Sequence, residues 1–395
     1  MSSSAAETVA NIEELLRQIL LSVPPRSLVR FKCVSKRWLS LISEPGFCGR
    51  SATLRKPKIS GFFSSKTEDN TFKAIPLGKR DKIPSGQNPF KAIHDSLGDG
   101  SARLKIIQSC NGLFLCLRYS CDSSRSNRSR YVADHAVYVV NPTTNQFLVL
   151  SSPRVEQMAR VNQLFVRYAL AFDPSKSPHY KVVCVSNSHL GNYLGYPYQI
   201  DIYSSETRKW KKRHNDLHQK RAMHFDSSSR EGAVYCNGAV HWIRCIDSIP
   251  CCYLRDGRFV RDAGDVLHYY DIAKGSLRLV AATPPVPVSV KTKYQGLVRR
   301  YFGEAGGRLY LIESYTHYDT QCEVMEMGKD YSGWFLKYHV DLNPVIAALL
   351  GRLLLSCALI ERRRRRKKII FCCIFLVSGF KEDGNHPYME TLACV

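Results

Sequence analysis

The side chains that could carry catalysis are scattered along this chain of 395 residues. The 12 histidines form no cluster. The chain also lacks G-x-S-x-G, H-E-x-x-H, G-x-x-x-x-G-K-[ST] and G-x-G-x-x-G, the spacings that serve acyl transfer, zinc hydrolysis and phosphate binding. His241 and His339 lie in strand-like runs, where packing is a simpler role than catalysis. We therefore expect a non-catalytic protein that needs no cofactor.

Cysteines are the second group of reactive side chains. There are 15 of them, an odd number, and no two stand at C-x-x-C spacing, so the sequence predicts no metal site. The first residues, MSSSAAETVANIEELLRQ, do not combine a basic start with an apolar run, which argues against a signal peptide. We interpret the cysteines as reduced, mostly buried thiols of a cytoplasmic or nuclear protein.

Positive charge is high but dispersed. Lys and Arg number 57 and Asp and Glu 34, a net charge of +23. The one dense block consists of Arg362, Arg363, Arg364, Arg365, Arg366, Lys367 and Lys368. This block is a candidate nuclear-localisation signal, a lipid-attracting patch or a charged loop. The net positive charge leaves an alternative function open. In this alternative the protein associates with nucleic acid through the dispersed charge and this block. The apolar runs near it are too short to span a membrane.

The N-terminal region has helical periodicity. Apolar residues recur at one helical face in Ile12, Leu15, Leu16, Ile19, Leu20 and Val23. Pro24-Pro25 ends that helix. Ser27 and Ser35 can cap two further short helices, and Glu44-Pro45 ends the last one. Three helices within forty residues cannot bury all this apolar surface, so we expect another chain, or the rest of this one, to cover part of it.

From about residue 61 the pattern becomes short β-rich runs separated by turn residues. The predicted strands are Leu104–Ile107, Leu113–Leu117, Ala136–Val140, Lys181–Val185, Gln199–Tyr203, Ala239–Ile243, Val266–Tyr270 and Arg308–Ile312. Two types of turn alternate three times along the chain. A tight Gly turn at Asn111, Asn237 or Gly307 is followed each time by a second turn, at Asn141, Asp271 or Gly328–Asp330 respectively. This recurrence favours a kelch-like β-propeller over a β-sandwich.

The helical segment LLRQILLSVPPRSLVRFKCVSKRWLSLISEPGF resembles the F-box, although Asn11-Ile12 stands where many F-boxes have Leu-Pro. The phrases SGFF, SCNGLFLC, NPTTNQF, AFDPSKSPHYKVV, IDIYSSETRKW, GAVYCNGAVHWI and YFGEAGGRLYLIE follow in order. They resemble the F-box-associated domain of a large plant family. The resemblance implies the substrate-recognition subunit of an SCF-type E3 ubiquitin ligase. Such a subunit docks on a Skp-type adaptor, through it reaches the cullin and RING subunits, and presents a target protein on its β domain.

The resemblance also implies which residues face the adaptor or form the core of the motif: Leu15, Leu16, Ile19, Leu20, Val23, Pro24, Leu28, Phe31, Val34 and Trp38. We expect an α+β multidomain chain, with a frayed tail over 1–10, a three-helix F-box over 11–48 and a linker over 49–60. The β domain follows over 61–346. A divergent segment over 347–395 is interpreted as part of the last blade. A hydrolase or lyase with polar groups in a propeller channel is a further alternative, without support in the sequence.

Overall fold

The computed structural model describes most of the chain. The described residues are 12–55, 58–66, 71–76, 90, 93, 102–120, 132–151, 153, 164–188, 199–213, 233–243, 252–255, 258–261, 267–280, 297–315, 321–341, 357–364, 367–374 and 382–395. The tail predicted over 1–10 lies outside them. Within this part of the chain, no helix is both long enough and apolar enough to span a membrane.

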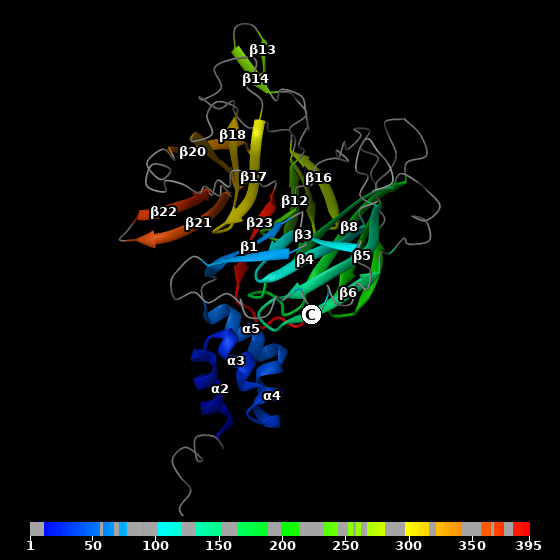
Figure 1. The fold of residues 1–395 in the computed structure, drawn as a ribbon, viewed down its shortest axis with the longest axis vertical. Helices are drawn as coiled ribbons and strands as arrows, with labels where there is room; N and C mark the ends of the chain where they lie inside the picture. Colours follow the sequence, from blue (N-terminus) through cyan, green and yellow to red (C-terminus); the bar gives the residue numbers. More distant parts are fainter. Residues whose placement is uncertain are drawn as a thin grey trace, which may run out of the picture.

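The N-terminal region folds into four helices in the described residues (Figure 1). They are α2 (Glu13–Ser22), α3 (Pro25–Phe31), α4 (Lys36–Ser43) and α5 (Pro45–Leu54). The prediction of three helices and a linker from residue 49 is therefore wrong in one respect. Pro45 does end α4, but it is also the first residue of α5. Proline suits that position because the missing N–H would have no partner there.

The predicted ends of the helices are partly confirmed. α2 stops at Ser22, just before the two prolines. The Ser35 hydroxyl caps α4 by accepting a hydrogen bond from the backbone N–H of Trp38 at 3.1 Å. Ser27 does not cap α3, because the helix already begins at Pro25 and Pro24 is its N-cap.

The rest of the described chain is β structure. The strands are β1 (Ile59–Lys66), β2 (Thr71–Pro76), β3 (Ala102–Cys110), β4 (Leu113–Ser120), β5 (Val132–Asn141), β6 (Gln146–Ser151), β7 (Leu164–Ala171), β8 (Lys181–Ser188), β9 (Gln199–Ser204), β10 (Lys209–Arg213), β11 (Val234–Cys236), β12 (Ala239–Ile243), β13 (Cys252–Arg255), β14 (Arg258–Arg261), β15 (Leu267–Asp271), β16 (Ser276–Val280), β17 (Leu297–Ala305), β18 (Arg308–Tyr315), β19 (Gln321–Met327), β20 (Trp334–Asp341), β21 (Cys357–Arg364), β22 (Lys367–Ile374) and β23 (Glu382–Met389). Each predicted run lies in one of these strands, except that Val266 lies outside the described residues.

Five antiparallel sheets in the described residues form the blades of a β-propeller (Figure 1). Four sheets have four strands, ordered β3-β4-β5-β6, β10-β9-β8-β7, β11-β12-β15-β16 and β17-β18-β19-β20. The fifth has the order β2-β1-β23, so the C-terminal strand completes the first blade. The strands β23, β3, β7, β11 and β17 contact one another in that order. The two-stranded sheet β21-β22 touches β17 and β23. This arrangement confirms the propeller and excludes the sandwich.

The recurring turns lie where a propeller needs them. Asn111-Gly112 joins the first two strands of its blade, and Asn237-Gly238 does the same in another blade. All four residues have positive φ, between 46° and 90°, the conformation that a two-residue hairpin requires and that Asn and Gly adopt most easily. Each asparagine also reaches the next blade: Asn111 Nδ2 donates to the Phe172 carbonyl at 2.7 Å.

A C-terminal tail, residues 390–395, connects the propeller to the helices. Leu392 lies in the hydrophobic core of the four helices. Asn141 Nδ2 donates to the carbonyls of Thr391 at 3.2 Å and Ala393 at 2.7 Å. The tail is thus held by a blade on one side and by the helices on the other, which places the helices at the end of the propeller where the tight turns lie (Figure 1).

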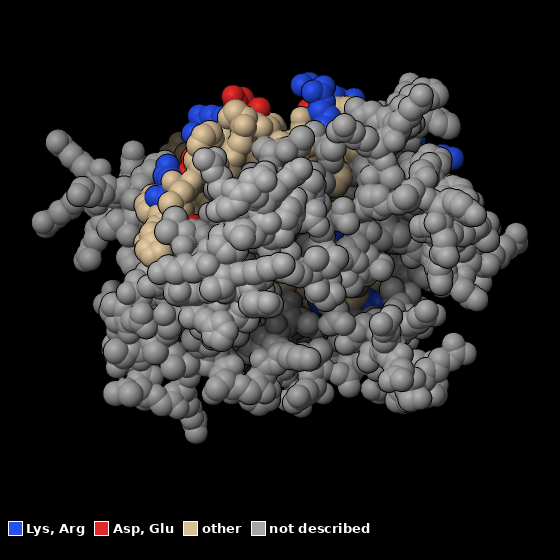
Figure 2. Space-filling view, turned by 90° about the horizontal axis from the view of Figure 1, so that it is seen from above, with Lys and Arg blue, Asp and Glu red and all other residues tan. Residues whose placement is uncertain are grey.

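The opposite end of the propeller is seen in Figure 2. On the part of this face that belongs to described residues, basic and acidic side chains are interspersed. The described surface there is not a uniform basic patch, although the chain as a whole is strongly basic.

Candidate functional site

The apolar stripe of α2 has two rows. Leu16 and Leu20 point into the helical core and are 3% and 0% exposed. Leu15 and Ile19 stand one position earlier and are 40% and 49% exposed. Because residues four apart lie on the same helical face, each pair forms a continuous row. The stripe that the sequence shows as one surface is therefore half core and half free surface.

Further large apolar side chains of the helical region are exposed. Ile12 is 46% exposed, Val34 60% and Leu39 47%. Ile12 precedes Leu15 by three residues and extends the outer row of α2. We call Ile12, Leu15, Ile19, Val34 and Leu39 the exposed apolar set. Single exposed apolar residues are ordinary on a protein surface, but several within one small helical unit are typical of an interaction site.

The ten residues predicted to face the adaptor or form the motif core thus have three different environments. Leu16, Leu20 and Leu28 are buried; Leu15, Ile19, Val34 and Pro24 are exposed; Val23, Phe31 and Trp38 are half-buried. The rings of Phe31 and Trp38 meet edge to face at 5.5 Å. Which of the ten contact an adaptor remains a prediction.

Charged side chains hold these helices together. Arg17 Nη2 binds Glu13 at 2.7 Å, and Arg17 Nη1 binds Glu44 at the junction of α4 and α5. The hydrogen bond from Arg17 lowers the pKa of Glu44. Arg55, just after α5, donates to the carbonyls of Leu21 and Val23 at the end of α2. These bonds satisfy carbonyls that a helix end leaves free and fix the helix from which Leu15 and Ile19 project.

The histidines of the β domain show no catalytic arrangement in the described residues. His241 is fully buried, with its ring nitrogens 3.2 Å from the Val234 carbonyl and 2.7 Å from the Tyr331 hydroxyl. Burial lowers the pKa of His241 to about 4, so the ring is neutral near pH 7. The packing prediction for His339 is wrong: it is exposed, because β20 is the outer strand of its blade.

The His, Cys, Asp and Glu side chains of the described residues form no group of three or more that could hold a metal ion.

The described part of the basic block lies in the paired strands β21 and β22. Arg363 pairs with Lys368 and Arg364 with Lys367 across β21 and β22, while Arg365 and Arg366 lie outside the described residues. Basic residues therefore occupy facing positions in the register of these two strands. Its role as a nuclear-localisation signal stays a prediction, and so does the alternative of nucleic-acid association.

Comparison with known families agrees with both parts of the structure. The F-box domain matches residues 13–48, and the F-box associated beta propeller domain matches residues 77–281. The F-box protein At5g07610 of Arabidopsis thaliana is 33% identical over 352 residues, which cover 88% of this chain and 74% of that protein. F-box only protein 8 from the same plant is 26% identical over 243 residues, covering 60% of this chain and 73% of the relative.

The described residues thus combine a small helical unit that exposes apolar side chains with a five-bladed β-propeller. The chain belongs to the plant F-box proteins that carry an F-box-associated β-propeller domain. Proteins of this family serve in general as substrate adaptors of SCF ubiquitin ligases, bind Skp-type adaptors through the F-box and are typically not catalysts themselves.

Some residues of the site were missed from sequence. Ile12 and Leu39 are as exposed as the predicted contacts, and the helical periodicity could have identified both. Leu392 belongs to the core of the F-box, yet its carbonyl meets a cysteine 344 residues away. No local pattern could have found that contact.

Proposed function

We propose that this protein is the substrate-recognition subunit of an SCF-type E3 ubiquitin ligase. In this proposal the F-box docks on a Skp-type adaptor, which leads to the cullin and RING subunits, and the propeller presents a target protein. The observation that carries the proposal is the exposed apolar set on a helical unit whose own core is complete without it.

Burial of the exposed apolar set can supply part of the free energy of docking. Fully burying one Leu or Ile side chain contributes about 1.5–3 kcal/mol. The members of the set are 40–60% exposed, so each has about 1 kcal/mol still to gain. Five such side chains give about 5 kcal/mol, enough to offset much of the cost of association.

The topology of the blades supports different roles for the two ends of the propeller. The tight turns at Asn111, Asn237 and Gly307 lie at the end that faces the F-box. In the same antiparallel blades, residues 121–131 and 189–198 connect strands that end on the opposite side. We therefore infer that a target protein binds the end remote from the F-box. The protein then acts by proximity, because holding a lysine near the ubiquitin-loaded enzyme raises its effective concentration.

Adaptor binding tests the proposal directly. In the variant Leu15→Gln, Ile19→Gln, Leu39→Gln, glutamine keeps a high helix propensity while removing apolar surface. The purified full-length variant should bind a Skp-type adaptor at least about 30-fold more weakly than the wild type, which corresponds to about 2 kcal/mol. Calorimetry or surface plasmon resonance measures the dissociation constants.

The matched control is Phe335→Thr, Leu336→Thr, which removes two similarly exposed apolar side chains from β20 of the propeller. This control should bind as the wild type does. Equal binding by the F-box variant and the wild type would contradict the proposal. Substitution of Leu16 or Leu20 is a poorer test, because both are buried and their loss would unfold the F-box. A cytoplasmic or nuclear location is part of the proposal and is tested by imaging a tagged chain.

A further inference from the structure

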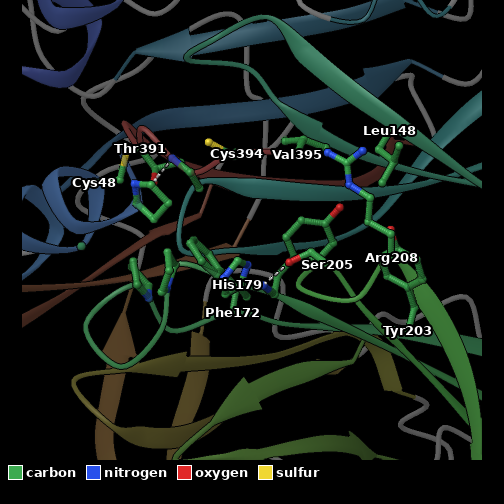
Figure 3. Close-up of a pocket in the computed structure, with 16 residues that line it drawn as sticks. Cys48, Leu148, Phe172, His179, Tyr203, Ser205, Arg208, Thr391, Cys394 and Val395 are labelled. Carbon is green, nitrogen blue, oxygen red and sulfur yellow. Dashed lines mark hydrogen bonds between the residues drawn. The ribbon is translucent and has the colours of Figure 1, made fainter. Parts of the chain in front are cut away.

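A cavity of about 140 Å³ lies where the F-box, the C-terminal tail and two blades meet (Figure 3). Its walls include Cys48 of α5, Phe172, His179 and Arg208 of the propeller, and Cys394 of the tail. The docking function does not use this cavity. It brings together two cysteines that come from the two ends of the sequence.

Cys48 is held in place by the backbone around it. It is 9% exposed and belongs to the core of the F-box. Its Sγ donates to the carbonyls of Ile42 and Leu392, each at 3.5 Å. Leu392 is itself buried among the F-box helices. The Cys48 thiol is thus fixed against the tail two residues before Cys394.

Cys394 is exposed and lines the same cavity as Cys48. The interaction with Cys48 lowers the pKa of Cys394, and the positive charge of Lys32 acts in the same direction. The same interaction and burial raise the pKa of Cys48. Of the two thiols, Cys394 is therefore the more accessible and the more easily deprotonated. Thiolate character and access to solvent are what make a cysteine react with oxidants.

Five other cysteines whose side chains the structure describes have different surroundings. Cys110, Cys116, Cys184 and Cys236 are buried. Burial raises the pKa of Cys110 and of Cys236 to about 12, which keeps these thiols protonated. Cys33 is exposed on the F-box and serves as a matched control for exposure alone.

We propose that Cys48 and Cys394 form a peroxide-sensitive pair whose disulfide joins the F-box to the C-terminal tail. The Cys394 thiolate attacks hydrogen peroxide, which gives a sulfenic acid and releases hydroxide. The Cys48 thiol then attacks the sulfenic sulfur, forms the disulfide and releases water. The two cysteines lose two electrons, which reduce one peroxide to one water and one hydroxide, and the hydroxide takes up a proton from solvent to give the second water. A dithiol reductant reverses the reaction.

The disulfide would fix the F-box to the propeller. The tail follows β23 directly, and β23 is paired with β1 in the first blade. A bond between Cys48 and Cys394 therefore ties α5 to the strand that completes the propeller. The orientation of the adaptor-binding helices relative to the blades then depends on the redox state of this pair.

Peptide mapping of the full-length protein tests the proposal. The protein is treated with hydrogen peroxide, free thiols are alkylated, and a non-reducing digest is analysed by mass spectrometry. We expect a peptide pair joined through Cys48 and Cys394 in the wild type and in Cys33→Ser. Both Cys48→Ala and Cys394→Ser should lose it, and dithiothreitol should remove it.

A second measurement does not depend on closing the disulfide. In Cys48→Ala the sulfenic acid at Cys394 has no resolving thiol, so dimedone should label Cys394 several-fold more than Cys33. Circular dichroism before treatment verifies that each variant is folded. Absence of the Cys48–Cys394 peptide from folded, oxidised wild type overturns the proposal, and so does equal dimedone labelling of Cys33 and Cys394.

Discussion

The F-box and the propeller use apolar side chains in opposite ways. In the F-box, neighbouring leucines of one helix differ sharply: Leu15 is 40% exposed and Leu16 is 3% exposed. In the propeller, Leu115 and Val139 of one blade and Leu170 of the next are fully buried in the core between the blades. A blade packs on both of its faces, whereas a helix of a four-helix unit buries one stripe. The helical unit therefore keeps apolar surface available for a partner, and the described propeller core is used for stability.

The largest difference in stability between a buried and an exposed apolar side chain is expected within α2. Leu20→Ala should destabilise the F-box by about 2–5 kcal/mol, because it leaves a cavity at a fully buried position. Leu15→Ala should change stability by less than about 0.5 kcal/mol, since its side chain is exposed. Hydrogen exchange of the α2 amides measures the change in F-box stability in each variant. Equal protection in the two variants would contradict the division of the stripe into core and surface.

The propeller and the F-box should also differ in how their stability depends on pH. The pKa of buried His241 is about 4, against 6.5 for a free histidine. Between pH 6.5 and 4 the unfolded chain therefore binds a proton that the folded blade does not. The stability present above pH 6.5 is progressively lost as the pH falls, by about 3 kcal/mol in total.

The described F-box residues 12–55 contain no histidine, so the F-box should not lose stability by this route. Hydrogen exchange of β12 and α2 between pH 4 and 6.5, corrected for intrinsic rates, distinguishes the two regions. His241→Gln is the control and should flatten the pH dependence of β12. A wild-type profile that is already flat there would show that His241 does not titrate as its burial predicts.

The smallest expected effect lies in the turns that join the blades. Asn237 has φ of 49°, and its Nδ2 donates to the Gly307 carbonyl at 3.0 Å. Asn237→Ala should cost about 1–2 kcal/mol, because it loses the bond and strains the turn. Asn237→Gly loses only the bond and should cost less. Thermal unfolding of the propeller compares them, and equal melting temperatures for the two variants would exclude a contribution from the backbone conformation.

Much of the fold could be predicted from local signals. Asn111-Gly112 and Asn237-Gly238 form the hairpins that the dipeptides indicate, and Ser35 caps its helix. Such features depend on a few consecutive residues, so they are readable in any context. Pro45 was misread because a proline both ends one helix and suits the start of the next. The local sequence alone does not show whether a proline such as Pro45 only ends one helix or also begins the next.

By itself, the sequence determined the two-part architecture, the helical periodicity of the F-box and the strand and turn repeat of the blades. Only the tertiary structure decided which row of the α2 stripe is buried and that β23 completes the first blade. It also decided that Cys48 lies beside the tail that carries Cys394. The physical reason is the range of the interactions. Turns and helix ends depend on neighbours in sequence, whereas burial and thiol chemistry depend on contacts between distant segments, such as Cys48 and Leu392, which are 344 residues apart.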